Sequence, residues 1–269
     1  MSSYFKDKVV VVTGGTDGIG KALVDDLLQA GAKVATCGRD HDKLYRLQAS
    51  YPSYPLHTMV ADVSKENESR RFIETTIKNF GGVDILINNA GISMRALLKD
   101  ASTEVIRRVM DINFFGAVYA TKYALESIVE RQGTIVGVSS IAGYRGLPGR
   151  SAYSASKYAL QGWLEAVKTE LIDSKVHVMW VCPGFTTSNI RAAALDKDAQ
   201  SHGETNMDEG KMMSAEECSR HILNAIRKKK RTLVLTFTGK EMVFLNKIFP
   251  RFADWITHRF YFKNGELVK

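Results

Sequence analysis

A regular alternation of short apolar segments with longer amphipathic segments constrains the fold of this chain more than any other feature of its sequence. Strands that are apolar along their whole length are typical of a parallel sheet covered on both faces. Right-handed connections between such strands favour a doubly wound Rossmann arrangement. The pattern therefore predicts an α/β fold, with a parallel seven-stranded sheet and helices on both faces. The first six strands are expected at residues 8–13, 33–37, 57–61, 84–88, 134–139 and 177–182.

The last third of the chain has a different character. Residues 186–213 are polar and poor in strand-forming side chains, which is typical of a functional lid or a mobile segment. The Ser-Ala-Glu-Glu run at 214–217 is a capping box that opens the next helix. Residues 232–238 alternate apolar and polar side chains and predict the seventh strand. We expect a single domain over residues 1–269, which includes the lid and a hydrophobic, basic C-terminal segment at 240–269.

Composition limits the classes of function. The chain has 269 residues, and its 37 Lys and Arg against 29 Asp and Glu give a net charge of +8. Much of the excess lies in the run 227–231 and beyond, and such a run is typical of a solvated helix end. The sequence shows no zinc-finger spacing and no aromatic nucleic-acid motif, so binding of nucleic acid is not expected. The six histidines show no metal-ligand spacing, so no metal is expected either.

The cysteines and the apolar stretches bear on location. Cys37, Cys182 and Cys218 are widely spaced and form no CxxC pair, which suits reduced thiols in a reducing compartment. No signal peptide precedes the first strand, and no stretch of about twenty residues is free of charge. We therefore expect a cytoplasmic location, with or without peripheral attachment to a membrane.

A glycine-rich turn follows the first predicted strand and opens the first predicted helix. Its sequence, Thr-Gly-Gly-Thr-Asp-Gly-Ile-Gly at 13–20, lets the backbone turn tightly and approach a pyrophosphate closely. Backbone N–H groups at the start of the helix can then bind the phosphates. The alternative is an ordinary strand–helix turn, but the position at the first such junction favours a nucleotide cofactor. The residues expected to contact the cofactor here are Gly14, Thr16, Asp17, Gly18, Ile19 and Gly20.

The end of the second predicted strand bears on which nicotinamide cofactor is bound. NAD-binding folds usually place an acidic residue there to hold the ribose 2′-hydroxyl. Cys37 stands at about that position, and Arg39 follows, where its guanidinium can bind a 2′-phosphate. Both features favour NADP(H). The alternative is that Arg39 only caps the loop while Asp40 turns inward.

Five motifs, in this order, resemble those of the short-chain dehydrogenases/reductases. They are TGxxxGxG at 13–20, Asn-Asn-Ala-Gly at 88–91, Ser140, the YxxxK pair at 153–157 and Pro-Gly at 183–184. The resemblance covers residues 6 to about 190. It implies an adenine contact after the third strand, a turn along the cofactor at 88–91, and a nicotinamide contact after the sixth strand. The cofactor residues that it implies are Asp62, Val63, Asn89, Ala90, Gly91, Tyr153, Lys157, Pro183, Gly184, Thr186 and Ser188; at the last position relatives usually carry threonine.

The resemblance also implies a catalytic set. Tyr153 and Lys157 are four residues apart, so they share one face of a helix, and a nearby ammonium lowers the pKa of a tyrosine. Ser140 is positioned to donate a hydrogen bond to the substrate carbonyl oxygen. Ser139 is its competitor, but neighbouring residues on a strand point to opposite faces, and the family spacing favours Ser140. Asn113 is either a buried structural anchor or the holder of a water that links Lys157 to solvent, and the two roles are compatible.

The predicted activity is therefore NADP(H)-dependent interconversion of a ketone and a secondary alcohol. Two alternatives remain: a sugar-nucleotide epimerase or dehydratase, and a catalytically silent NADP-sensing binding protein. An epimerase usually needs a larger C-terminal substrate domain. A silent protein is expected to have lost a catalytic side chain, and all four are present.

The segment 240–263 alternates clusters of apolar residues with lysines and arginines. It predicts either a basic amphipathic surface that lies on a membrane or an apolar stripe packed on the body or on a second subunit. Pro250 is expected to break or kink a single helix there. An apolar carbonyl substrate is preferred, such as a lipid, a steroid or an aromatic ketone. The family resemblance implies a homodimer or homotetramer, formed through the helices that carry Asn113 and Tyr153.

Overall fold

A computed structural model describes residues 2–187, 189–191, 193–200 and 212–268 of the chain. Its main sheet has seven strands in the order β3-β2-β1-β4-β5-β6-β7, and every neighbouring pair is parallel. The predicted doubly wound α/β fold is thus confirmed. The strands are β1 (Val9–Thr13), β2 (Lys33–Gly38), β3 (Leu56–Val60), β4 (Ile85–Asn88), β5 (Thr134–Val138), β6 (His177–Cys182) and β7 (Thr232–Val234).

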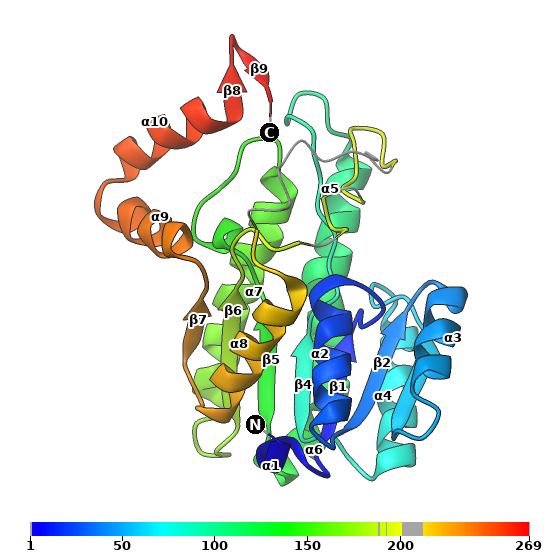
Figure 1. Cartoon of the computed structure of the whole chain (residues 1–269). Coiled ribbons are helices and arrows are strands. Elements are labelled where there is room, and N and C mark those ends of the chain that lie inside the picture. Colours follow the sequence, from blue (N-terminus) through cyan, green and yellow to red (C-terminus); the bar gives the residue numbers. More distant parts are fainter. Residues whose placement is uncertain (1, 188, 192, 201–211, 269) are drawn as a thin grey trace.

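Helices cover both faces of this sheet (Figure 1). Adjacent strand residues point to opposite faces, so Val10 and Val12 enter one core while Val11 enters the other. The first core is closed by α2 and α8, and the second by α4, α6 and α7. The helices are α1 (Ser2–Phe5), α2 (Gly18–Gln29), α3 (His41–Ser50), α4 (Glu66–Phe80), α5 (Thr103–Met110), α6 (Gly116–Glu130), α7 (Ser151–Glu170), α8 (Ala215–Arg227), α9 (Phe237–Ile248) and α10 (Pro250–Tyr261).

Side-chain caps start several of these helices. Asp17 accepts a hydrogen bond from Gly18 N at 2.7 Å, and Asp40 accepts one from Lys43 N at 3.0 Å. Ser214 accepts from Glu217 N at 3.1 Å, as expected from the capping-box sequence. The caps place the first turns of α2 and α3 beside the carboxyl ends of β1 and β2.

The predicted seventh strand is too long. β7 ends at Val234, and α9 begins at Phe237. Thr236 has a positive φ of 63° and accepts a hydrogen bond from Gly239 N, so it caps a helix although residues 232–238 alternate like a strand. Ahead of the first strand, residues 2–5 form the short helix α1, which the sequence pattern did not predict.

The C-terminal segment leaves the sheet after β7 and returns over the end at which the strands finish (Figure 1). Pro250 divides it into α9 and α10, as predicted, because proline fits the first turn of a helix but not its interior. A hairpin of β8 (Phe262–Lys263) and β9 (Glu266–Leu267) follows. Its Leu267 side chain lies against Gly149, in the loop that precedes α7. None of the helices in the described part of the chain combines the length and the apolarity that a bilayer span requires.

The predicted lid at 186–213 is described only in part. Thr186 and Met213 pair as an isolated bridge, which brings the two ends of the segment together. Ser188 and residues 192 and 201–211 lie outside the described residues. Leu195 pairs with Met94 in a second bridge, so part of the segment is held against the loop after β4.

Candidate active site

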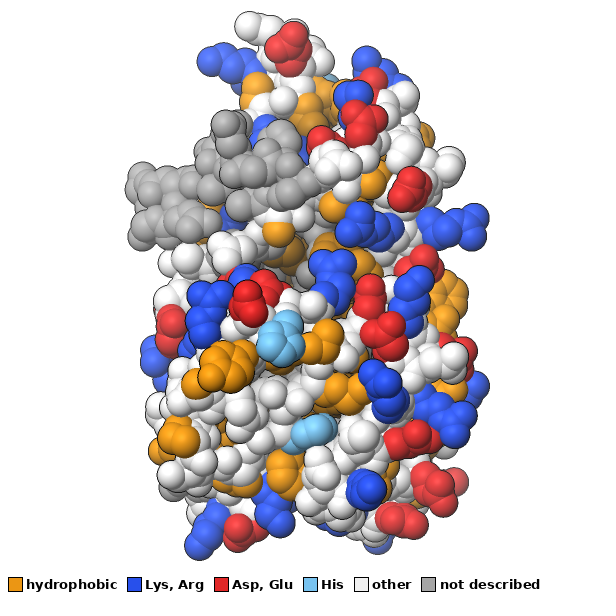
Figure 2. Space-filling model, turned by 90° about the vertical axis from the view of Figure 1, so that its right-hand side faces the viewer, with side chains coloured by type: hydrophobic (Ala, Val, Ile, Leu, Met, Phe, Trp, Pro, Cys, Tyr) orange, Lys and Arg blue, Asp and Glu red, His pale blue; other side chains and the backbone are white. Residues whose placement is uncertain are grey.

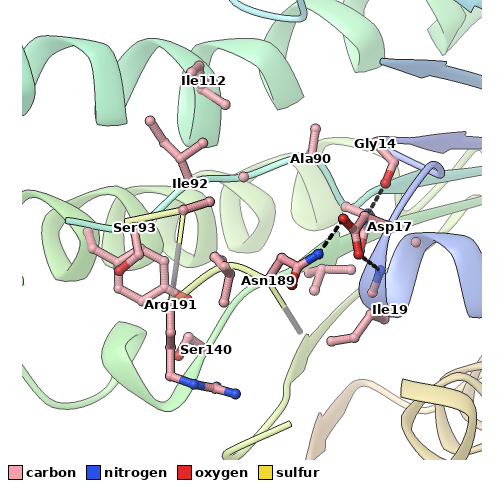
Figure 3. A pocket seen from close by; sticks show the side chains of 18 of the residues that line it. Gly14, Asp17, Ile19, Ala90, Ile92, Ser93, Ile112, Ser140, Asn189 and Arg191 are labelled. Carbon is pink, nitrogen blue, oxygen red and sulfur yellow. Dashed lines mark hydrogen bonds between the residues drawn. The ribbon is translucent and has the colours of Figure 1, made fainter. Parts of the chain in front are cut away.

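A cavity of about 520 Å³ opens where the carboxyl ends of β1 and β4 meet, at the point where the strand order reverses. In doubly wound sheets this is the position at which ligands bind. The glycine turn lies at one end, with Gly14, Asp17 and Ile19, and Ser140 and Arg191 lie at the other (Figure 3). The predicted site residues that line the cavity are Gly14, Thr16, Asp17, Gly18, Ile19, Gly20, Arg39, Asp62, Val63, Asn89, Ala90, Gly91, Ser140, Tyr153, Lys157, Pro183, Gly184 and Thr186.

The glycine turn leaves no room for larger side chains. Gly14 and Gly18 have positive φ angles of 69° and 50°. A Cβ on Gly20 would collide with the Gly14 carbonyl oxygen and the Asn89 amide. Because α2 begins at Gly18, the amides of its first turn have no partner inside the helix. The turn therefore fits a phosphate-bearing ligand, which needs close backbone approach and free N–H donors.

Asn89 and Thr13 fasten this turn to β4. The Asn89 side-chain amide donates to Thr13 O at 2.9 Å and to Gly14 O at 3.1 Å. The Thr13 hydroxyl accepts from the backbone N–H groups of Asn89 and Ala90, both at 3.0 Å. The Asn-Asn-Ala-Gly turn thus has a structural role as well as a place along the cavity wall.

The end of β2 forms the rim beside the glycine turn. Arg39 is exposed, and its side chain forms no hydrogen bond or ion pair within the described part of the chain. Asp40 is also exposed and caps α3, so it does not turn inward. Lys43 forms an ion pair with Asp17 at 2.8 Å across this rim. Burial would raise the pKa of Asp17, but hydrogen bonds from Lys43 and Asn189 and the charge of Lys43 lower it overall.

Tyr153, Lys157 and Ser140 meet at the other end of the cavity. Tyr153 and Lys157 lie one turn apart on α7, and the Lys157 Nζ is 5.6 Å from the centre of the tyrosine ring. Lys157 is only 3% exposed, and its ammonium donates to Val138 O at 2.8 Å. Ser140 follows β5 and caps a 3₁₀ turn by accepting from Ala142 N at 3.1 Å.

Ser139 takes a different role from its neighbour. Its hydroxyl is buried, accepts a hydrogen bond from the Gln161 amide at 2.7 Å, and lies 3.4 Å from Lys157 O. Ser140 instead hydrogen-bonds with Tyr153, which lowers the pKa of that tyrosine. This arrangement favours Ser140 as the residue that faces a substrate.

Asn113 is not on the cavity wall. It lies in a π-helical turn, Asp111–Phe115, between α5 and α6, and is 2% exposed. Its side-chain oxygen accepts a hydrogen bond from Ile92 N at 2.8 Å. Its side-chain nitrogen donates to Ile92 O and to the Ser156 hydroxyl, both at 2.9 Å. These bonds bear out the structural part of its expected role, and the proton-relay part stays a prediction.

The pKa of Tyr153 differs from the value that the sequence analysis expected. Burial raises the pKa of Tyr153, and the opposing influences are the Ser140 hydrogen bond and the charges of Arg150 and Arg191. Burial also lowers the pKa of Lys157 to about 8. The pKa of Tyr153 is therefore raised and not lowered as expected, and the cations that oppose desolvation are two arginines.

Comparison with known proteins decides the family. The sequence model of short-chain dehydrogenases matches residues 8–199. The chain belongs to the short-chain dehydrogenase/reductase family. It is 37% identical to the rat dehydrogenase/reductase SDR family member 7B over 259 residues, which cover 93% of this chain and 80% of that protein. It is 32% identical to the Drosophila melanogaster dehydrogenase/reductase SDR family protein 7-like over 257 residues, which cover 93% and 79%.

Two solved structures show the same fold. A short-chain dehydrogenase/reductase from Burkholderia phymatum, in complex with NAD, matches with a TM-score of 0.82 and 20% identity over 92% of this chain and 95% of that one. A short-chain dehydrogenase from Streptomyces avermitilis matches with a TM-score of 0.80 and 24% identity over 94% and 97%. Membership of the family places the chain among oxidoreductases that use nicotinamide cofactors and act on small molecules.

Several functional neighbours were not predicted from the sequence. The Thr36 hydroxyl donates to Val12 O at 2.7 Å and accepts from Gly15 N at 3.0 Å, so it supports the glycine turn from β2. Ser156 accepts from Asn113 and donates to Tyr153 O at 2.7 Å; its place inside the YxxxK motif was the available signal. Arg150 and Tyr261 also line the cavity, and no motif pointed to either.

Other classes of site receive no support from the described residues. Within them, no group of three His, Cys, Asp or Glu side chains is placed to hold a metal ion. All three cysteines are free and buried, and burial raises the pKa of each thiol to about 12. On the face shown in Figure 2, lysines and arginines are interspersed with acidic side chains instead of forming a basic patch.

Proposed function

We propose that this protein is an NADP(H)-dependent oxidoreductase that interconverts a ketone and a secondary alcohol. The observation that carries the proposal is a single cavity with the glycine turn and Arg39 at one end and Ser140, Tyr153 and Lys157 at the other. The glycine turn would hold the pyrophosphate, Asp62 and Val63 the adenine, and Pro183, Gly184 and Thr186 the nicotinamide end. Ser188 is proposed for the same contact, although it lies outside the described residues.

Side chains of this protein bind the carbonyl oxygen of the substrate and transfer the proton. A bound nicotinamide cofactor supplies hydride to the ketone carbon or accepts it from the alcohol. Ser140 donates a hydrogen bond to the carbonyl oxygen, where negative charge develops. Tyr153 gives its phenolic proton to that oxygen in reduction and takes it back in oxidation. Lys157 stabilises the resulting phenolate, and Asn113 is proposed to hold a water that links Lys157 to solvent.

The proposed preference for NADP(H) comes from the rim beside β2. Arg39 is exposed and free to form a charge-assisted bond with a 2′-phosphate. Asp40 is used as a helix cap, and Cys37 is buried, so neither presents a carboxylate to a 2′-hydroxyl. The Burkholderia phymatum relative was solved with NAD, which makes this preference a specific test of the present chain.

An apolar carbonyl substrate is proposed for the same cavity. Ile92, Leu147, Phe185 and Tyr261 are among the apolar and aromatic residues that line it. Their side chains suit a lipid-like, steroid-like or aromatic arm next to the carbonyl.

A peripheral contact with an anionic membrane is proposed for residues 240–263. Phe244, Phe249 and Trp255 of this segment are 64%, 57% and 53% exposed. Lysines and arginines lie among them, and such a mixture binds anionic lipid surfaces. The test is flotation with vesicles of phosphatidylcholine alone or with phosphatidylserine added. Binding that requires phosphatidylserine is expected, and self-association without vesicle binding would contradict it.

A cytoplasmic homodimer or homotetramer is also proposed. The three free cysteines suit a reducing compartment. Phe115 and Tyr158 are 40% and 46% exposed on the helical segments that carry Asn113 and Tyr153, and a second subunit would cover them. Sedimentation of the wild type and of Tyr158→Asp tests this, because a charge at the proposed interface should favour the monomer.

Titration of NADPH and NADH into the purified protein, followed by cofactor fluorescence, tests the central proposal. The wild type should bind NADPH more tightly, and Arg39→Ala should lose roughly 10- to 100-fold in NADPH affinity with little effect on NADH. Arg251→Ala removes an exposed arginine of α10 and is the matched control. If NADPH and NADH bind with equal affinity, and Arg39→Ala leaves both affinities unchanged, the NADP(H) preference is contradicted while the oxidoreductase activity is not. Binding of NADPH without turnover of any ketone or alcohol would favour the silent sensor.

A further inference from the structure

A hydrogen bond connects the glycine turn to the segment that follows β6. The Asn189 side-chain amide donates to the Asp17 carboxylate at 2.7 Å, although the two residues are 172 positions apart in the chain. Both residues line the cavity, and Figure 3 shows the Asn189 amide directed toward Asp17. The glycine turn is the wall proposed for the pyrophosphate, and the segment after β6 is the wall proposed for the nicotinamide. The bond therefore joins two walls between which one dinucleotide would extend.

Asp17 uses both of its carboxylate oxygens. Oδ1 accepts from Gly18 N at 2.7 Å and caps α2, while Oδ2 accepts from Lys43 Nζ at 2.8 Å and from the Asn189 amide. One carboxylate thus links the start of α2, α3 and the segment after β6. The ammonium of Lys43 offsets the negative charge of Asp17, which would otherwise repel a phosphate beside the glycine turn. Asn189 contributes a donor to this group without adding a charge.

Backbone hydrogen bonds already hold the segment on both sides of Asn189. On one side, Thr187 N donates to Met213 O at 2.9 Å. On the other side, Leu195 N donates to Ser93 O, in the loop after β4, also at 2.9 Å. Attachment of the segment to the body of the protein therefore does not require the Asn189 side chain. What this side chain fixes is the distance between the segment and the glycine turn.

The strength of the Asp17–Asn189 bond suits a contact that forms and breaks. Its acceptor is a carboxylate, so the bond is charge-assisted. The Asp17 side chain is 39% exposed and Asn189 is also exposed, so water competes for both groups. The net effect of one such hydrogen bond corresponds to a roughly three- to tenfold change in an equilibrium. The bond can therefore favour a closed arrangement of the two walls and still open at a useful rate.

We propose that Asn189 and Asp17 are positioning residues that set how long a nicotinamide cofactor stays bound. The inference rests on the proposed function, because it requires a dinucleotide between the glycine turn and the segment after β6. With the bond formed, the two walls enclose the cofactor, and release requires the bond to break. Asn189 is not part of the proposed 2′-phosphate contact, so the bond slows the release of NADPH and of NADH by the same factor.

Stopped-flow measurement of cofactor release tests the inference without any substrate. NADPH or NADH bound to the purified full-length chain is displaced by excess oxidised cofactor, and the change in fluorescence gives the dissociation rate constant. In Asn189→Ala this rate constant should rise roughly three- to tenfold for both cofactors. Asn189→Asp keeps the shape of the side chain but places two carboxylates together, so it should release both cofactors faster still. Asn67→Asp, at an exposed position of α4, is the matched control and should behave as the wild type.

An exchange of the two residues separates this specific bond from a general loosening of the segment. Asp17→Asn combined with Asn189→Asp restores one amide and one carboxylate, with donor and acceptor reversed. The double variant should release NADPH more slowly than Asn189→Asp alone, because the two substitutions are coupled through one bond. The melting temperature of cofactor-free Asn189→Ala should stay within about 2 °C of the wild type, as for other exposed positions.

The possible outcomes separate the inference from the proposed function. Unchanged release of both cofactors from Asn189→Ala and Asn189→Asp would overturn the inference and leave the proposed function intact. Faster release of NADPH alone would also overturn it, because Asn189 would then act on the 2′-phosphate. A lower melting temperature of Asn189→Ala without faster release would show that the bond only stabilises the fold. A wild type that binds neither NADPH nor NADH would overturn the proposed function and the inference with it.

Discussion

The two ends of the cavity are built in different ways. The cofactor end is made by the first four strands and their turns, where Thr13, Thr36 and Asn89 link the glycine turn to its neighbours through hydrogen bonds to the backbone. The end proposed for the substrate is lined by residues of three segments that are distant in sequence: the loop 145–150, the segment after β6, and α10. The side chains there are Arg150, Phe185, Arg191 and Tyr261.

The difference separates what the fold requires from what the substrate requires. At the proposed cofactor end, the backbone of the glycine turn forms much of the wall, and a Cβ added to Gly15 or Gly20 would collide with a neighbour. At the substrate end, side chains from mutually independent segments define charge and shape. The first end should therefore respond to substitution through cofactor affinity, and the second through ketone selectivity.

Tyr153→Phe should have the largest effect. It removes the proposed proton donor at the substrate end, and general acid catalysis contributes about 10²- to 10⁴-fold to rate. We expect kcat to fall by about that factor while NADPH affinity changes less than threefold. Stopped-flow rates and fluorescence titration of the same preparation measure both quantities. A variant that retains most of its activity would remove Tyr153 from the mechanism.

Gly20→Ala tests the cofactor end alone. The added methyl group would collide with the Gly14 carbonyl and displace the Asn89 amide, so the turn must open. We expect NADPH affinity to fall at least tenfold, with a loss of roughly 1–3 kcal/mol in stability from overpacking. Gly162→Ala is the control, since no atom beyond the local backbone of α7 lies within 4 Å of the position its Cβ would take. Equal behaviour of the two variants would mean that the turn does not contact the cofactor.

The pH dependence of the reaction tests the electrostatics around Tyr153. The groups around Tyr153 are Ser140, Arg150, Lys157, Cys182 and Arg191, and burial raises its pKa above the usual value of 10.0. The phenol therefore stays protonated as pH rises to about 10, and reduction should be retained over that range. Alcohol oxidation needs the phenolate. The rate of oxidation should therefore still increase several-fold per pH unit near pH 10. Removing the Arg150 charge should shift this rise to higher pH, and initial rates in both directions measure it.

Tyr261→Ala should have the smallest effect on catalysis and should act on the substrate end alone. Tyr261 is 5% exposed and contributes one wall of the cavity beside Arg150. We expect a roughly three- to tenfold rise in KM for the ketone with unchanged NADPH affinity, together with about 3 kcal/mol of destabilisation. Tyr45→Ala, at an exposed position of α3, is the control. A loss of NADPH affinity in Tyr261→Ala would show that the two ends are not independent.

The same contrast explains what the sequence could predict. Apolar strands, helical periodicity and the glycine turn are local signals, and the parallel sheet and the place of Asp17 followed from them. The places of Asn89, Tyr153 and Lys157 along the cavity followed from the resemblance to the short-chain dehydrogenases/reductases. β7 was predicted too long because the positive φ of Thr236 and its cap on α9 leave no trace in an alternating pattern. Arg150 and Tyr261 could not be assigned, since their roles depend on α10 returning across the cavity.

Transfer of a labelled hydride tests the central claim most directly. NADPH carrying deuterium at its hydride-donating carbon is incubated with the wild type and a set of lipid-like, steroid-like and aromatic ketones, and the products are analysed by mass spectrometry. The account predicts a secondary alcohol with one deuterium on the carbinol carbon, formed more slowly from NADH deuterated in the same way. Absence of labelled alcohol from every ketone, with a folded protein that binds NADPH, would contradict it.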